Sequence, residues 1–276
     1  MEHFNAWNSA DHLENFSEWS RDLEIYRNLR NRQIYGNLGR CISEVIDHSA
    51  VINELGVGGG RSFQYFRWLT QNASHETYDY LGYDIAPACV DFCKEKFGNR
   101  FELIEEDGTY RPCDLFYFFD VLVHAPEPLR LIEKVGLSAK KYLCFQTPTR
   151  DCGQTEFDVE KSCRLENGVW VPWIVFNVDE LIGHLRDQGF ERFLVLKTYK
   201  QFAGGGNRYL PREFFDPETG SARTAICAIK HGVSGGLDRL QKEIEIIKVQ
   251  DETRIPLIIS IMNKLFRKIQ RVRTTR

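Results

Sequence analysis

Several features that would point to particular protein classes are missing from this 276-residue sequence. Its eight cysteines are scattered, and none of them forms a C-x-x-C pair, which argues against a zinc ribbon or a thioredoxin-like site. No apolar run reaches the about 20 residues that a membrane-spanning helix needs. The first residues also lack the basic and then apolar order of a secretory signal. We therefore expect a reduced, cytoplasmic protein without a metal site.

The charge of the chain is nearly balanced but unevenly distributed. The 36 basic side chains face 39 acidic ones, so the net charge is −3 and the pI is near 6.2. This balance argues against binding to nucleic acids. Residues 254–276 hold seven of the basic side chains and no acidic one, which leaves 29 basic against 39 acidic side chains elsewhere. The body is therefore acidic and its C-terminal end basic.

Strand-like and helix-like segments alternate along the middle of the chain. The strand candidates are residues 50–55, 78–84, 100–105, 114–120, 141–147, 191–199 and 222–230. The helix candidates are residues 61–71, 87–97, 127–137 and 178–188. Such alternation predicts a doubly wound α/β fold, with a mostly parallel seven-stranded sheet covered by helices on both sides. Because no helix separates the last two strands, we expect them to pair antiparallel at one edge.

The alternating segments define one domain with additions at both ends. Residues 1–48 carry apolar side chains at helical spacing, interrupted by Gly36 and Gly39, and predict an N-terminal helical cap. Residues 49–232 form the α/β domain. Within it, residues 148–177 form a long insertion, and insertions of this length are often lids or binding loops.

The most informative motif is a glycine-rich turn, Glu54-Leu55-Gly56-Val57-Gly58-Gly59-Gly60, directly after an apolar strand candidate. Glycine allows the backbone to bend sharply there and lets a ligand come close. A dinucleotide-binding turn requires G-x-G-x-x-G, but the third glycine position holds Arg61 or Phe63, depending on the register. No Lys-Ser or Lys-Thr pair follows, which excludes a phosphate-binding P-loop.

What remains is an acid-x-G-x-G-x-G pattern, which resembles motif I of the class I S-adenosylmethionine-dependent methyltransferases. Further segments resemble that family in the same order along the chain: Asp84 with Ile85, Glu106-Asp107-Gly108, Asp120 to His124, and Phe176 to Phe190. The resemblance covers about residues 50–230 and implies S-adenosylmethionine as the cofactor. Val123 stands where the family usually has an acid before the histidine.

The resemblance also implies roles for the cofactor-side residues. Glu54 corresponds to the acid that orients the turn (Gly56, Gly58 and Gly60) and approaches the methionine amino group. Asp84, followed by Ile85, corresponds to the acid that accepts hydrogen bonds from the ribose hydroxyls. Asp107 and Gly108 correspond to the element at the adenine. Asp120 is expected to be a cofactor-side or structural acid.

Structural interpretations of the same residues stay open. Asp84 could instead cap the helix that begins near Pro87, and Asp107-Gly108 could be a simple turn.

His124 is the candidate general base, because histidine can accept a proton near neutral pH. It could equally be a structural histidine before Pro126. Trp170 and Trp173 could line an acceptor pocket, although core packing is the favoured interpretation. Other loop residues near the expected ligand edge are Tyr110, Arg150, Asp151 and Arg208.

The sequence therefore predicts an S-adenosylmethionine-dependent methyltransferase that acts on an oxygen of a small-molecule or sugar/glycan-type acceptor. Two alternatives stay open. One is a methyltransferase-like binding or assembly protein without catalysis, and the other is an NAD(P)-dependent dehydrogenase, which the missing third glycine disfavours.

The C-terminal extension, residues 237–276, carries its own pattern. Apolar residues at heptad spacing predict a short coiled coil within 237–252 that joins subunits into a homo-oligomer. Residues 254–276 predict a basic amphipathic helix that contacts an anionic membrane surface or a partner protein. A helix packed back on the core is the alternative.

Overall fold

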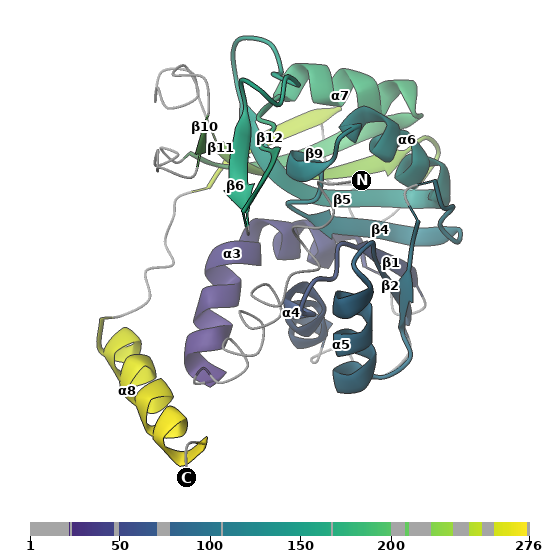
Figure 1. Cartoon of the computed structure of the whole chain (residues 1–276). Helices are drawn as coiled ribbons and strands as arrows, with labels where there is room; N and C mark the ends of the chain where they lie inside the picture. Colours follow the sequence, from purple (N-terminus) through teal and green to yellow (C-terminus); the bar gives the residue numbers. More distant parts are fainter. Residues whose placement is uncertain are drawn as a thin grey trace.

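The computed structural model contains a central sheet with helices on both faces (Figure 1). It describes residues 22, 24–46, 50–70, 78–105, 107–166, 168–199, 208–209, 222–233, 243–249 and 257–274. Nine strands of this described part form the central sheet, in the order β12-β9-β11-β5-β4-β1-β2-β3, with β8 paired to β5. Their bounds are β1 Val51–Leu55, β2 Asp79–Asp84, β3 Phe101–Leu103, β4 Cys113–Phe119, β5 Ala139–Arg150, β8 Phe176–Asn177, β9 Phe190–Tyr199, β11 Ala222–Lys230 and β12 Ile244–Lys248.

The predicted doubly wound sheet is confirmed, because all seven strand candidates form strands of this sheet. β11 is the antiparallel strand and pairs with both β5 and β9. The neighbours β2 and β3, β1 and β2, β1 and β4, and β4 and β5 are parallel. Two details differ from the prediction. The sheet has nine strands and not seven, because β8 pairs with β5 and β12 pairs with β9. The pair of β9 and β11 therefore does not close the sheet, since β12 lies parallel to β9 outside it.

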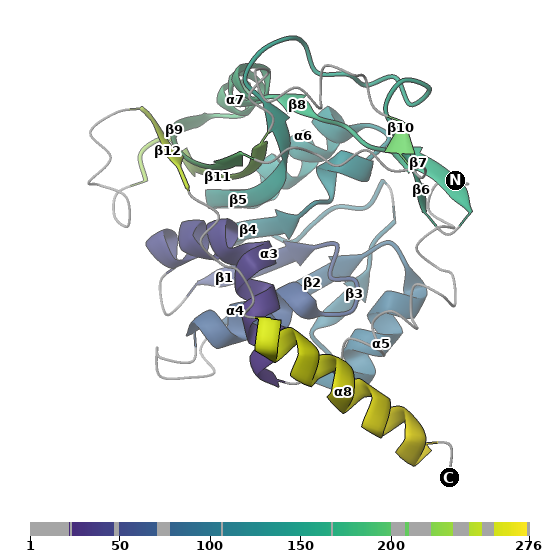
Figure 2. The ribbon, with the colours of Figure 1, turned by 90° about the vertical axis from the view of Figure 1, so that its left-hand side faces the viewer.

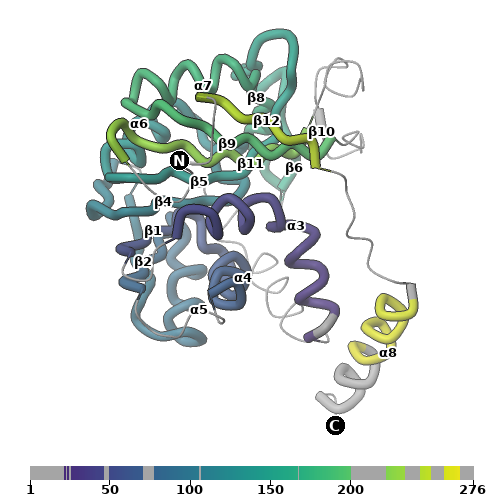
Figure 3. Tube along the Cα trace, turned by 180° about the vertical axis from the view of Figure 1, so that it is seen from behind, coloured from purple at the N-terminus to yellow at the C-terminus, as the bar shows by residue number. Residues whose placement is uncertain are grey.

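Helices form one layer on each face of the sheet (Figure 3). One layer contains α3 Glu24–Val45, α4 Arg61–Thr70 and α5 Pro87–Phe97, and the other contains α6 Pro128–Ser138 and α7 Val178–Asp187. A separate apolar cluster fills the space under each layer. The strands are covered on both faces, which explains why they are apolar almost throughout.

Helix α3 belongs to this layer, and Gly36 and Gly39 do not interrupt it. The expected break is therefore wrong. Helix packing explains why residue 39 is a glycine, since a Cβ atom there would lie 2.5 Å from the ring of Tyr65 on α4. The glycine lets the two helices approach closely. The rest of the predicted cap, residues 1–21, 23 and 47–48, lies outside the described residues.

The 148–177 insertion is largely folded. After the end of β5 it forms a hairpin of β6 Cys163–Glu166 and β7 Val169–Pro172, and β10 Arg208–Tyr209 pairs with β6. The backbone N–H of Ile174 donates to the carbonyl of Val123 at 2.9 Å, which ties the base of the hairpin to the loop after β4. The insertion therefore stands beside the carboxyl ends of the strands.

The predicted coiled-coil helix within 237–252 is wrong for residues 243–249, because residues 244–248 form β12. Three isoleucines in this segment favour a strand, and the open edge of β9 offers unpaired backbone groups to it. Residues 237–242 and 250–252 lie outside the described residues. The predicted homo-oligomer thus loses the helix on which it rested.

The amphipathic helix farther along the chain is confirmed as α8, Leu257–Thr274. Figure 2 shows α8 beside the end of α3, on the outside of the lower helical layer. No helix in the described part of the chain has the length and apolar character needed to cross a membrane.

Candidate functional site

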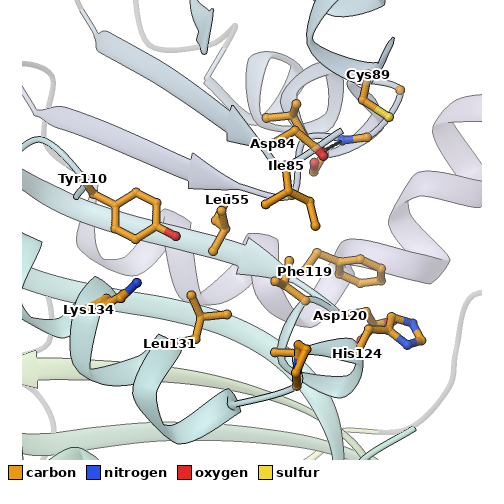
Figure 4. Close-up of a pocket in the computed structure, with 18 of the residues that line it drawn as sticks. Leu55, Asp84, Ile85, Cys89, Tyr110, Phe119, Asp120, His124, Leu131 and Lys134 are labelled. Carbon is orange, nitrogen blue, oxygen red and sulfur yellow. Dashed lines mark hydrogen bonds between the residues drawn. The ribbon is translucent and has the colours of Figure 1, made fainter. Parts of the chain in front are cut away.

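A cavity of about 530 Å³ opens at the carboxyl ends of β1, β2 and β4. In parallel α/β sheets, ligands bind at this edge. Figure 4 shows Tyr110, Leu131 and Lys134 near one end of the cavity, and Phe119, Asp120 and His124 near the other. The glycine turn, the loop after β4, the start of α6 and the strand β6 all contribute to the wall. The volume is in the usual range for small-molecule sites.

The glycine turn forms one side of the cavity as predicted, through Gly56 and Gly58. Its backbone is fixed to the end of β2, because the N–H of Gly56 donates to the Tyr83 carbonyl at 2.8 Å. Gly56 has φ 73°, and a Cβ atom there would lie 2.5 Å from Cγ2 of Val121. A side chain at this position would therefore strain the turn and press into the loop after β4.

Asp84 joins the glycine turn to the segment before α5 and does not itself cap that helix, whose N-cap residue is Ala86. Its Oδ2 accepts the N–H of Gly58 at 2.8 Å, and its Oδ1 accepts the N–H of Ala86 at 2.9 Å, just before α5. Asp84 and Ile85 also line the cavity. Burial raises the pKa of the Asp84 carboxyl, and the backbone donors lower it. A carboxylate with four acceptor positions can hold the turn and still accept hydrogen bonds from a ligand.

Glu54 is placed differently from the prediction, because its side chain lies beneath the turn and is only 1% exposed. Oε2 accepts from the hydroxyls of Tyr80 and Tyr117, each at 2.5 Å, and Oε1 accepts from Ser62. The carboxyl thus links β1, β2, β4 and α4. Burial raises the pKa of Glu54 to about 7, although the three hydroxyl donors lower it. Glu54 therefore supports the turn from the protein interior and is not among the residues that line the cavity.

The predicted adenine-side residues also lie away from the wall. The Asp107 side chain is exposed and pairs with Arg130 at 3.0 Å and Lys134 at 3.5 Å. Both cations line the cavity, and Glu105 lines it as well, whereas Asp107 does not. Gly108 packs against Ile104.

Gly60 closes the turn behind the cavity through its N–H, which donates to Val57 at 2.8 Å. Among the described residues, the six predicted site residues that reach the wall are Gly56, Gly58, Asp84, Ile85, Asp120 and His124.

Asp120 has a strained backbone, with φ 50°, directly after β4. Such conformations in residues other than glycine cluster at functional sites. Its Oδ1 is buried and has no hydrogen-bond partner within the described protein, while Oδ2 lies 3.7 Å from Arg223. Burial raises the pKa of Asp120 to about 6, against the charges of Arg223 and Arg164. An acceptor atom with no protein donor on a cavity wall suits a ligand that carries N–H or O–H groups.

His124 ends the short 3₁₀ helix η2, Leu122–His124, and lines the cavity. Its Nδ1 lies 2.9 Å from the carbonyl oxygen of Pro172, at the end of β7. A carbonyl only accepts, so Nδ1 carries the proton and Nε2 is the acceptor nitrogen of the neutral ring. Trp173 packs against the imidazole with ring centroids 5.2 Å apart. These contacts fix the orientation of the imidazole on the cavity wall.

Several wall residues were not predicted. Tyr35 on α3 packs edge-on against Phe119, with ring centroids 4.4 Å apart. Arg164 and Glu166 reach the wall from β6 and form an ion pair with each other. Tyr35 and β6 are remote in sequence from the motifs, and no local pattern marks them. Glu105 lies two residues before the predicted Asp107, so a shift of the aligned motif would have found it.

The remaining loop candidates divide into several groups. Tyr110 lines the cavity, and Trp173 is buried against Val123 and Val175, which confirms core packing for this tryptophan. Trp170 is 46% exposed. Asp151 accepts from Tyr199 at 2.7 Å and pairs with Lys197, beside Arg150 at the end of β5. The side chain of Arg208 lies outside the described residues.

None of the groups of His, Cys, Asp and Glu in the described chain is arranged to hold a metal ion.

Comparison with known proteins gives structural matches only. No family model and no curated protein sequence matches the chain. A solved S-adenosylmethionine-dependent methyltransferase of Thermotoga maritima, described as a possible histamine N-methyltransferase, matches with a TM-score of 0.50. It is 15% identical, and the match covers 82% of this chain and 99% of that one. Magnesium protoporphyrin IX methyltransferase of Synechocystis PCC 6803 matches with a TM-score of 0.46 and 13% identity, over 82% and 94% of the two chains.

The fold of this chain is therefore that of the S-adenosylmethionine-dependent methyltransferases. The central sheet contains the strand order β3-β2-β1-β4-β5-β11-β9 with one antiparallel strand, and α3, the β6–β7 hairpin and α8 lie around it.

Proposed function

We propose that this protein is an S-adenosylmethionine-dependent methyltransferase acting on a small-molecule acceptor. The observation that carries the proposal is the joint position of the glycine turn and Asp84. The Asp84 carboxylate holds the Gly58 N–H at 2.8 Å, and both residues face the cavity at the sheet edge. The fold supports the same assignment.

The wall residues fit such a cofactor. Gly56 has no Cβ atom, which lets Val121 of the loop after β4 pack against the turn on the cavity wall. Asp84 offers carboxylate oxygens to paired hydroxyl groups, and Oδ1 of Asp120 offers a buried acceptor to an ammonium group. When bound, S-adenosylmethionine supplies a methyl group activated by its sulfonium charge, so the protein mainly has to align the acceptor.

We propose a hydroxyl-bearing acceptor, such as a sugar, at the His124 end of the cavity. Nδ1 of His124 is engaged by Pro172, and Nε2 can accept the proton that an acceptor hydroxyl loses. Tyr35 and Phe119 offer an aromatic surface beside it, and the ion pair of Arg164 and Glu166 offers polar groups. This combination of flat aromatic and charged side chains suits a polar ring.

Titration calorimetry tests the cofactor directly. The full chain should bind S-adenosylmethionine and its demethylated product in the micromolar range, and NAD(P) should give no heat. Absence of S-adenosylmethionine binding at millimolar concentration would refute the proposal. Binding without methyl transfer to any of a panel of hydroxyl, amine and carboxylate acceptors would favour the non-catalytic alternative.

A further inference from the structure

Helix α8 presents an apolar stripe to solvent. Ile258, Ile261, Met262 and Leu265 lie at positions i, i+3, i+4 and i+7 and therefore share one face of the helix. Their side chains are between 48% and 68% exposed. Single exposed apolar side chains are common, but a continuous apolar face marks an interaction surface.

The opposite face of α8 is fixed to the protein. Asn263 donates from Nδ2 to Oδ1 of Asp22 at 2.8 Å, and Arg267 donates from Nε to the same oxygen. Asp22 and Asn263 are both buried. At about 100° per residue, these two positions lie on the side of the helix away from the stripe. These contacts of Asp22 with Asn263 and Arg267, here called the clamp, therefore hold the apolar stripe outward in a fixed orientation.

The charge of α8 indicates which kind of surface the helix can bind. Residues 257–274 include five basic residues and no acidic one: Lys264, Arg267, Lys268, Arg271 and Arg273. The rest of the chain has a net negative charge, so the net positive charge lies at the end that carries the stripe.

We propose that α8 docks this protein on an anionic lipid surface, lying in the plane of the surface with its apolar stripe in the headgroup region. A nucleic acid would match the charge but leave the stripe exposed to water. An acidic protein groove would match both features. The lipid surface is favoured because the stripe is carried outward on a single projecting helix that can lie flat.

The docking helix lies near the cavity. It contacts α3, which carries the wall residue Tyr35. Burial lowers the pKa of the wall residue Arg61, and the charges near this guanidinium include Asp22 and Arg267, which have opposite effects on it. Docking would thus hold the α3 and α4 side of the cavity close to the lipid. Lipid binding itself does not require methyl transfer, so it can be tested independently of the proposed function.

Flotation of the full chain with vesicles tests the inference. One set contains phosphatidylcholine alone, and the other contains phosphatidylcholine with phosphatidylglycerol. The protein should float with the anionic vesicles, and less so as salt rises. Ile261→Glu combined with Leu265→Glu should weaken partitioning by about tenfold or more, because two apolar side chains are lost from the lipid contact. Leu137→Glu is the matched control, since Leu137 is 82% exposed on α6 in the other helical layer.

Lys264→Glu provides a second variant, should the double substitution impair folding as judged by circular dichroism. It should weaken binding to anionic vesicles and leave the apolar stripe intact. Absence of flotation by the wild-type chain, equal flotation with neutral vesicles, or wild-type flotation by the folded double variant would each overturn the inference. So would light scattering that shows a dimer which dissociates in the double variant, because a second copy of the chain would then cover the stripe.

Discussion

The ring Nδ1 of His124 lies 2.9 Å from the carbonyl oxygen of Pro172, and this contact joins the loop after β4 to the last residue of the hairpin strand β7. The hydrogen bond fixes the tautomer and the direction of the imidazole. The hairpin belongs to the insertion between β5 and β8. The insertion thus orients the candidate base.

Replacement of His124 tests its role as a base. His124→Gln should lower kcat for a hydroxyl acceptor by about 100-fold or more, because general base catalysis contributes about that much. Affinity for S-adenosylmethionine should change little. His231→Gln is the matched control, because the side chain of His231 is exposed just after β11 and does not line the cavity. A kcat unchanged in His124→Gln would leave this histidine with a structural role only.

Asp84 and Asp79 stand at opposite ends of β2 and form a matched pair. Asp84→Asn should raise the Kd for S-adenosylmethionine about tenfold or more, because the amide offers one acceptor oxygen in place of two. Asp79→Asn removes an ion pair with Arg111 at the far end of the strand and should leave the Kd unchanged. Calorimetry measures both. Equal Kd values for wild type and Asp84→Asn would show that the site is assigned wrongly.

Local signals explain which parts of the fold could be predicted. The strands and the turn at Gly56 and Gly58 follow from apolar runs and glycine spacing, which need no knowledge of distant residues. The prediction of a coiled-coil helix was wrong because the spacing of Ile244 and Ile247 also fits a heptad. Their branched side chains favour a strand, and this strand pairs with β9 at the edge of the sheet.

The direction of Glu54 could not be predicted, because a strand buried on both faces shows no alternation that marks the cavity side. Tyr35 and Arg164 reach the wall only through the packing of α3 and of the hairpin, which bring together segments about 130 residues apart. The part of the cavity wall formed by the glycine turn, Asp84 and the loop after β4 was therefore accessible from sequence, whereas Tyr35 and Arg164 needed the tertiary structure.

Two glycines of α3 should respond in opposite ways to the same substitution. Gly36→Ala should raise the free energy of unfolding by about 0.5–1 kcal/mol, because alanine favours the helix and a Cβ atom there meets no atom within 4 Å. Gly39→Ala should lower it by about 1–3 kcal/mol, because the Cβ atom would press on Tyr65. Urea unfolding measures both changes. A stabilising Gly39→Ala would contradict the close packing of α3 on α4.

The buried carboxyl of Glu54 should make stability depend on pH. Burial raises its pKa from an ordinary value of 4.5 to about 7 in the folded protein. Between these values the native protein keeps a proton that the unfolded chain has released, so the free energy of unfolding falls as pH rises through this window. The loss attributable to Glu54 is about 3 kcal/mol by pH 7.

Glu54→Gln isolates this contribution, because glutamine has a similar shape and no charge at any pH. The variant should match the wild type at about pH 3, where Glu54 is protonated in both states, and should gain on it progressively towards pH 7. Asp120, whose pKa is raised to about 6, titrates in the same direction, but it is present in both proteins and cancels in the difference. Urea unfolding across this pH range measures the difference. A constant difference would mean that Glu54 stays charged in its network of Ser62, Tyr80 and Tyr117, with those three hydroxyls compensating fully for its burial.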